Sequence, residues 1–396
     1  MKKNKIKIFK KAICASGVFV FAFFAFFILS HTYYFGSTVE HYLNQATVAK
    51  GFSQAKPEIV SHIQTPKPVK AIYMTSWVAG EKSIRNRLVD LIDNTELNSV
   101  VIDIKDYTGK IAFETQNKKL RKYNAFENRI PDIKEFLEHL HNKDIYVIGR
   151  VSVFQDPHFV KQRPDLAVKI TKNGAIWRDY KGLSWLDAGS IEVWNYMITL
   201  AQEAYQIGFD EINFDYVRFP SDGDMTQIYY PLSEDRVISD PDKGKSKILR
   251  EFFVYLDNSL KNTDAVLSVD LFGMTTTNGD DLNIGQILED ALLSFDFVAP
   301  MVYPSHYPND FIGLANPAEH PYEVVKYSMD CAVEKARRAS TTPNKLRPWL
   351  QDFDLGADYT AEMVRAQIQA VYDAGLNGWM LWSAANRYTK DALKLE

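Results

Sequence analysis

The sequence is poor in the residues on which several common kinds of functional site depend. Only two of its 396 residues are cysteine, Cys14 and Cys331, and no cysteine or histidine spacing matches a metal site. No glycine-rich phosphate turn follows an early strand pattern, and no Gly-x-Ser-x-Gly elbow is present. We therefore expect no disulfide framework, no catalytic metal, no cofactor and no esterase-type serine.

The chain also lacks a strong excess of charge of either sign. It has 46 Lys and Arg residues against 50 Asp and Glu residues, which gives a formal net charge of -4 and predicts no nucleic-acid partner. The exception is the N-terminus, where residues 1–11 include six lysines and no acidic residue precedes Glu40. An apolar run at 12–29 follows, and about 18 such residues are enough to span a bilayer.

This N-terminal pattern predicts a membrane tether. The lysines should remain in the cytoplasm and the rest of the chain should lie outside. We favour an uncleaved signal anchor over a cleaved signal peptide, because the apolar run ends in ILSHTYY, a poor cleavage site. The predicted organisation is a basic tail at 1–11, a single-pass transmembrane anchor at 12–30, a proline-containing extracellular stem at 31–68 and a folded domain at 69–396.

From Val69 onward, β-rich runs alternate with helical patterns, which is typical of a parallel sheet with crossover helices. The eight expected strands are 71–77, 99–106, 145–154, 211–219, 266–273, 295–304, 346–353 and 378–384. The expected helices are 84–94, 130–142, 191–207, 246–262, 284–293, 322–339 and 361–374. Eight such units predict a single (β/α)8 TIM barrel, with a doubly wound open sheet as the alternative. The longest insertions, 155–190 and 220–245, follow strands and belong to the C-terminal face, where catalysis occurs in this fold.

Ionisable residues near strand ends are informative, because strands of a parallel barrel are buried on both faces. Asn213 and Asp215 share parity, and Asp270 ends the next expected strand at an equivalent depth. Glycoside hydrolysis requires two such carboxylates: one protonates the leaving oxygen, and the other attacks the anomeric carbon or activates water. Asp215 is therefore the candidate nucleophile or base and Asp270 the candidate acid, although Asp270 could instead cap a turn.

Other side chains are expected at the same mouth of the barrel. Asp103 and Lys105 share parity and, with Arg150, either set the charge of the site or form a structural ion-pair network. Arg218 either sets charge or holds the loop that begins at Pro220. Asp187 is a candidate for the site, and either Asp187 or Ser190 is expected to cap the helix that follows. The remaining candidates are Gln351 and three aromatic residues expected to shape sugar subsites, Trp185, Tyr303 and Trp382.

Four motifs resemble a glycosyl hydrolase domain family of bacterial surface proteins, and the resemblance extends from Val69 almost to the C-terminus. The motifs are KAIYMT (70–75), VIDIKD (101–106), WLD (185–187) and, most specifically, FDYVRFP (214–220). The resemblance implies a glycoside-hydrolase-like TIM barrel in which Asp215 is the key carboxylate. It also points to Asp270 as the partner, although related groups often have Glu there.

The expected function is an extracellular glycosidase acting on a cell-wall, capsule or exopolysaccharide. The main alternative is a non-catalytic glycan-binding barrel at the cell surface, which would keep the aromatic residues but lack a workable carboxylate pair. A hydrolase for another bond, such as an amide of peptidoglycan, is a weaker alternative, because the metal and nucleophile motifs for that chemistry are missing.

Overall fold

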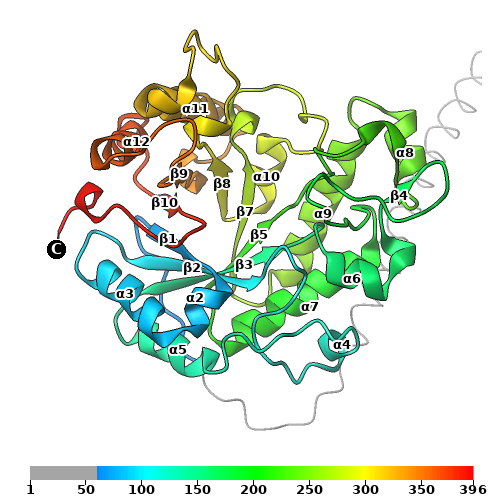
Figure 1. The fold of residues 1–396 in the computed structure, drawn as a ribbon, viewed down its shortest axis with the longest axis horizontal. Coiled ribbons are helices and arrows are strands. Elements are labelled where there is room, and N and C mark those ends of the chain that lie inside the picture. Colours follow the sequence, from blue (N-terminus) through cyan, green and yellow to red (C-terminus); the bar gives the residue numbers. More distant parts are fainter. Residues whose placement is uncertain (1–59, 396) are drawn as a thin grey trace, which may run out of the picture. The chain divides into compact units, whose positions relative to one another are not determined.

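The short apolar runs form strands whose two faces are both covered. In the computed structural model, which describes residues 60–395, every residue of β2 (Ser99–Lys105), β3 (Tyr146–Ser152) and β5 (Glu211–Asp215) is buried. The other barrel strands are β1 (Lys70–Met74), β7 (Val266–Phe272), β8 (Phe297–Met301), β9 (Trp349–Gln351) and β10 (Trp379–Trp382). These eight parallel strands close in the order β1-β10-β9-β8-β7-β5-β3-β2 (Figure 1), so the predicted barrel is confirmed and the open sheet is excluded.

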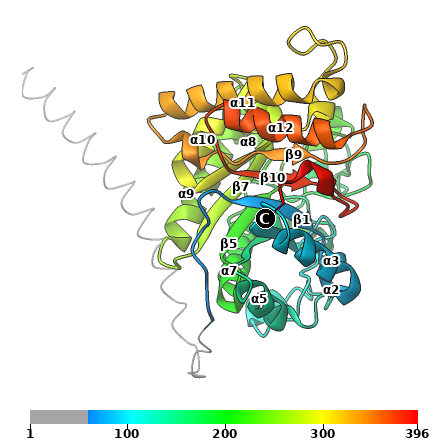
Figure 2. The same ribbon diagram turned by 90° about the vertical axis from the view of Figure 1, so that its left-hand side faces the viewer.

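Helices surround the barrel and follow the expected pattern closely. The longer ones are α3 (Lys82–Asp93), α5 (Ile133–His141), α7 (Ile191–Ile207), α9 (Gly244–Leu260), α11 (Pro321–Arg338) and α12 (Ala361–Asp373). The shorter ones are α2 (Ser76–Gly80), α4 (Lys118–Arg121), α6 (Pro157–Gln162), α8 (Glu234–Ser239) and α10 (Leu288–Ser294). Figure 2 shows α11 and α12 side by side on one flank of the barrel. Helix α10 starts four residues later than expected, after a turn in which Gly285 has a φ of 86°.

The two long insertions pair with each other. The loop after β3 contributes β4 (Lys169–Ile170) and the loop after β5 contributes β6 (Ile228–Tyr229), which form a two-stranded antiparallel sheet. The buried Asp187 carboxylate accepts hydrogen bonds from the Leu232 backbone N–H (2.7 Å) and the Ser233 hydroxyl (2.6 Å), which joins the same two loops. The loops behind β3 and β5 therefore form one connected layer at the C-terminal end of the barrel.

The opposite end of the barrel is closed by a buried ion pair. Arg347 and Glu211 are 2 % and 0 % exposed. Both terminal nitrogens of the guanidinium donate to the carboxylate, with 3.2 Å between Nη1 and Oε2. The Tyr146 hydroxyl donates to the same carboxylate at 3.2 Å. A charge taken out of water needs such partners, because an isolated buried charge costs several kcal/mol.

The predicted stem at 31–68 extends too far toward the C-terminus, because residues 60–68 lie against this end of the barrel. The Ile63 backbone N–H donates to Asp210 at 3.0 Å, the Thr65 hydroxyl donates to Tyr146 at 3.1 Å, and the His62 ring stacks on Tyr205 at 4.0 Å. The packed domain therefore includes at least nine residues before Val69, because their polar groups find partners at the strand N-termini. The predicted anchor at 12–30 lies outside the described residues. Within residues 60–395, none of the helices has both the length and the apolar character needed to cross a bilayer.

The buried ion pair at the base gives a stability prediction. We expect Glu211→Ala to lower the free energy of unfolding by about 3–5 kcal/mol, because it leaves the Arg347 charge buried without a partner. Denaturant-induced unfolding followed by circular dichroism measures this loss.

The chain offers a matched control in a pair of the same chemistry at the surface. Arg236 and Glu251 also interact through two hydrogen bonds, of 2.9 and 2.7 Å, but their side chains are 43 % and 55 % exposed. Glu251→Ala should cost less than about 1 kcal/mol. Equal losses for the two variants would contradict a structural role for the buried pair.

Candidate active site

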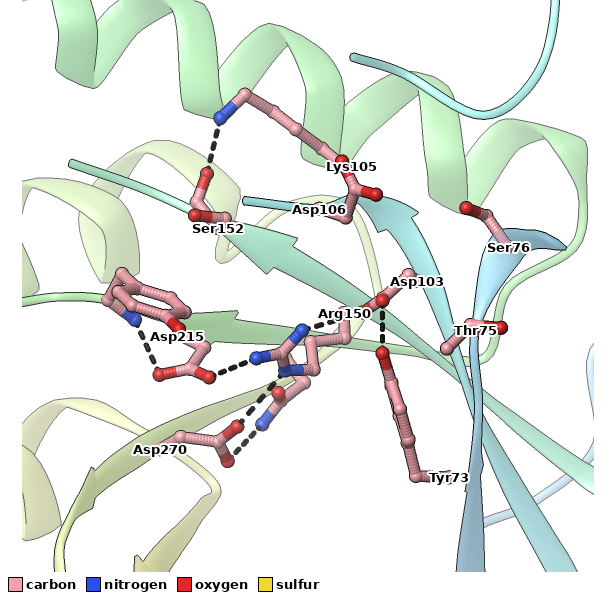
Figure 3. Close-up of polar contacts among 12 residues, drawn as sticks. Tyr73, Thr75, Ser76, Asp103, Lys105, Asp106, Arg150, Ser152, Asp215 and Asp270 are labelled. Carbon is pink, nitrogen blue, oxygen red and sulfur yellow. Dashed lines mark hydrogen bonds and ion pairs between the residues drawn. The ribbon is translucent and has the colours of Figure 1, made fainter. Parts of the chain in front are cut away.

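Three carboxylates surround one guanidinium near the C-terminal end of the barrel. Arg150 on β3 donates from Nη1 to Asp103 Oδ1 at 2.6 Å and from Nη2 to Asp215 Oδ2. Asp270 Oδ2 lies 3.7 Å from Arg150 Nε, which is an ion pair but too long for a hydrogen bond. Figure 3 shows the four side chains converging from separate strands. All four residues are buried, with exposures between 1 % and 6 %.

The strand register explains this convergence. Asp103 pairs with Arg150, Arg150 with Asn213, and Asn213 with Ser268 across β2, β3, β5 and β7. Asp215 and Asp270 follow two residues later on their strands, so their side chains lie on the same side one level nearer the C-terminal face. The long Arg150 side chain spans the two levels and contacts carboxylates in both.

The Asp270 carboxyl has an environment that keeps its proton. Burial raises its pKa to about 8, together with the negative charge of Asp215, and this outweighs the lowering by Arg150 and two hydrogen bonds. Asn213 Nδ2 donates to Asp270 Oδ1 at 2.9 Å, and Trp349 Nε1 donates to the same oxygen at 2.8 Å. Since Oδ1 accepts both bonds, the proton belongs on Oδ2.

Asp103 and Tyr73 hold Arg150 from the other side. The Tyr73 hydroxyl donates to Asp103 Oδ2, so both oxygens of this carboxylate are occupied. Burial raises the Asp103 pKa despite the adjacent Arg150 guanidinium. The Tyr73 ring stacks on Trp382 with centroids 4.0 Å apart, and Trp382 lies 5.1 Å from the Arg150 guanidinium. Asp103 therefore positions Arg150, and the half-buried Trp382 covers it.

The chain turns sharply directly after Asp215. The backbone N–H of Tyr216 donates to Asp215 Oδ1 at 2.5 Å, and Tyr216 has a φ of 53°, in the left-handed region. A bulky residue in that region costs about 1–3 kcal/mol and is maintained only by its surroundings. This turn ends β5 at Asp215 and fixes the carboxylate through its own backbone.

Two of the expected side chains lie near the carboxylates. Tyr303, two residues after β8, is close enough that Asp270 and Asp215 add to the effect of burial in raising the pKa of its hydroxyl. The Arg218 guanidinium lies over the ring of Phe272, the last residue of β7, at 4.8 Å.

Lys105 does not join the cluster. The pairing of β2 with β3 shifts register between Asp103 and Lys105, so equal parity no longer gives equal direction. The Lys105 ammonium instead donates to the Ser152 carbonyl (Figure 3). It also pairs with Asp156 at 2.9 Å, and both charged side chains are fully buried. Its role is to anchor the loop after β3.

Three further expectations are corrected by burial and by hydrogen-bond partners. Trp185 is 0 % exposed and donates to Asp179 at 3.0 Å, so its faces are closed to a sugar. Asp187 joins the two long loops, and the cap of α7 is Ser190. Gln351 accepts from the Ser305 backbone N–H and donates to the Phe353 carbonyl, so both ends of its amide are occupied by backbone.

Sequence patterns missed several residues that complete the site. The signal that could have found Asn213 is its parity with Asp215, which places both side chains on the same side of the strand. Tyr73 and Trp349 carry no such signal, because aromatic residues are ordinary in the core of a strand. Among residues 60–395 no group of acidic, histidine or cysteine side chains is arranged to hold a metal ion, and Arg150 fills the space between the three carboxylates.

Three solved structures illustrate what this chain is similar to. A hypothetical protein from Ruminiclostridium thermocellum is 36 % identical over 50 % of this chain and 96 % of its own, with a TM-score of 0.44. The PgaB (BpsB) glycoside hydrolase domain from Bordetella bronchiseptica is 15 % identical over 84 % of this chain and 100 % of its own, with a TM-score of 0.61. The Flavobacterium johnsoniae chitobiase is 13 % identical over 83 % of this chain and 48 % of its own, with a TM-score of 0.51. The last two likenesses concern the fold alone.

No curated protein matches the chain. The model of the family described as "Putative glycosyl hydrolase domain" matches residues 71–388, which include every strand end described above. The chain therefore belongs to this glycosyl hydrolase domain family.

Proposed function

We propose that this protein is a membrane-anchored extracellular glycoside hydrolase that cleaves a cell-wall, capsule or exopolysaccharide with Asp215 and Asp270. The observation that carries the proposal is the unequal environment of two carboxylates on one guanidinium. Asp215 is ion-paired with Arg150, whereas burial and the Asp215 charge raise the Asp270 pKa to about 8. Acid-assisted glycoside cleavage requires one carboxyl group that holds a proton and a second one that acts at the anomeric carbon.

The roles follow from the contacts. Asp270 donates its Oδ2 proton to the glycosidic oxygen as the bond to the anomeric carbon breaks, and the departing sugar leaves as an alcohol. Asp215 supplies negative charge on the reacting face, either attacking the anomeric carbon or activating the water that adds to it. Arg150 keeps Asp215 in place, and the positive charge developing on the sugar is stabilised by the carboxylate next to it.

A non-catalytic glycan-binding barrel is the second candidate. The observation in its favour is the small exposure of the two carboxylates, 6 % for Asp215 and 1 % for Asp270. Hydrolysis assays distinguish the two functions, because a binding barrel would retain glycans without producing new reducing ends.

Replacing the key carboxylate tests the proposal. We expect Asp215→Asn to reduce the rate of glycan hydrolysis by about 10³-fold or more, since it removes the group that acts on the anomeric carbon. The measurement is reducing-end release from a panel of wall and exopolysaccharides.

Asp224→Asn is the control, because Asp224 is an exposed residue of the loop after β5 whose side chain, among the described residues, bonds only to Thr226 and Gln227. It should hydrolyse at the wild-type rate. If the wild type degrades a glycan and Asp215→Asn keeps the full rate, the role given to Asp215 is wrong.

The raised pKa of Asp270 predicts a pH profile. A general acid works only while protonated, so activity should be present below about pH 8 and fall as the pH rises through that value. Asp270→Asn should lose about 10²–10⁴-fold on natural glycans, with a smaller loss on aryl glycosides, whose leaving groups need little protonation. Its remaining aryl-glycosidase activity should lack the alkaline decline. A variant that keeps the wild-type pH profile would exclude Asp270 as the acid.

The membrane tether makes a separate prediction, independent of the chemistry. Full-length protein in bacterial cells should sediment with membranes and be digested by protease added to intact spheroplasts. Removing residues 1–30 should release it into the soluble fraction, because the lysine-flanked apolar run is its membrane anchor. Recovery of the intact chain in the soluble fraction would count against the anchor.

A further inference from the structure

Arg218 differs from every other buried arginine of the described region. Five arginines in residues 60–395 are buried: Arg85, Arg129, Arg150, Arg218 and Arg347. Four of them pair with a carboxylate within 4 Å: Arg85 with Asp132, Arg129 with Asp106, Arg150 with its three aspartates and Arg347 with Glu211. No carboxylate of the described residues lies within that distance of Arg218.

Aromatic rings and a few polar atoms take the place of a counter-ion. The guanidinium lies 4.6 Å from the Trp185 ring, 4.8 Å from Phe272 and 5.6 Å from Tyr216. Its Nη1 donates to the Phe219 carbonyl at 3.1 Å and to the Ser221 hydroxyl at 3.0 Å. Nε and Nη2 have no hydrogen-bond partner among the described residues. Ring faces stabilise a cation by about 0.5–2 kcal/mol, which leaves the charge unneutralised.

The position of this cation relates it to the proposed reaction. Tyr216 directly follows Asp215, and Phe272 comes two residues after Asp270, so Arg218 lies beside the ends of both strands that carry the proposed catalytic pair. The residue is 7 % exposed, with two nitrogens available. Burial lowers the pKa of the Arg218 guanidinium, and the nearby Tyr216, Asp215, Asp222 and Asp179 offset only part of that effect. A planar donor with free N–H groups is suited to a carboxylate or another oxyanion.

We propose that Arg218 binds an oxyanion carried by the glycan, so that the substrate is an acidic polysaccharide. The inference rests on the proposed function for the location of the glycan over β5 and β7. It assigns Arg218 to specificity: the anionic sugar supplies the missing counter-ion, and a neutral glycan would leave the cation buried and unpaired. The oxyanion is the carboxylate of an acidic sugar or a sulfate or phosphate ester, which share this recognition chemistry.

The test compares polymers that differ only in charge. Full-length Asp215→Asn protein, which binds without turnover, is run in affinity electrophoresis through three pairs: polygalacturonate and its methyl ester, hyaluronate and its methyl ester, and dextran sulfate and dextran. We expect the acidic member of at least one pair to bind about 10-fold more tightly or better, since hydrogen bonds to charged groups are the strong ones. The first two pairs report a carboxylate, and the third reports a sulfate ester.

Substitutions at two arginines separate charge recognition from loop support. Adding Arg218→Gln should abolish the preference for the acidic polymer, and Arg218→Lys should keep part of it. Arg178→Gln is the matched control: exposed Arg178 also donates from Nη1 to a carbonyl, that of Gly182 (2.9 Å), and to a serine hydroxyl, that of Ser184 (3.2 Å). It should keep the full preference. Thermal unfolding of each variant checks that the fold is retained.

The outcomes distinguish this inference from the proposed function. No preference in any pair, or equal losses in Arg218→Gln and Arg178→Gln, overturns the role of Arg218. Wild-type protein is assayed for hydrolysis of the same polymers. If the wild type cleaves a glycan without preferring the acidic polymers, the proposed hydrolase activity stands and the proposal of an acidic substrate is wrong. If binding depends on Arg218 but no glycan is cleaved, the role of Arg218 stands and the proposed hydrolase activity is wrong.

Discussion

The ion pairs of Arg150 are the interaction on which the candidate site depends. One guanidinium is shared by Asp103, Asp215 and Asp270 in a buried setting, and a single positive charge cannot balance three negative ones there. The direct hydrogen bonds go to Asp103 and Asp215, while Asp270 remains 3.7 Å away and keeps its proton up to about pH 8. Burial and the negative charge of Asp215 raise the Asp270 pKa, and Arg150, which bonds directly to Asp103 and Asp215, offsets only part of that effect.

The two ends of the barrel use buried charge differently. At the N-terminal end, Glu211 and Arg347 form a pair of equal and opposite charges, and the Tyr146 hydroxyl donates a further hydrogen bond to the Glu211 carboxylate. Around the candidate site at the C-terminal end, three carboxylates share Arg150, and no carboxylate of residues 60–395 lies within 4 Å of Arg218. In TIM barrels generally, catalytic residues lie at the C-terminal face, whereas the N-terminal face contributes stability.

The long loops behind β3 and β5 connect these features. Asp187 and the β4–β6 pair hold the two loops together, and Trp185, which the β3 loop carries inward, provides a ring face for Arg218. Trp185 and Asp187, which the sequence predicts at the site itself, instead support it: Asp187 joins the two loops and Trp185 packs against Arg218. The chain turns at Tyr216, whose φ lies in the left-handed region, and the Arg218 guanidinium lies 5.6 Å from the ring of this residue, which directly follows Asp215.

The sequence by itself determined the barrel and the strand ends at which the carboxylates lie. A parallel barrel requires buried strands that alternate with covering helices, and each of these elements leaves its own hydrophobic pattern in a short segment of the sequence. The same local logic identified Asp215, Asp270, Asp103 and Arg150 as polar residues in apolar strands. Only the tertiary structure decided which of these groups touch. A register shift removed Lys105, loop packing buried Trp185, and the pairing of distant segments brought Tyr73, Asn213 and Trp349 to the carboxylates. Those contacts depend on how strands far apart in the chain align, and no local pattern encodes that alignment.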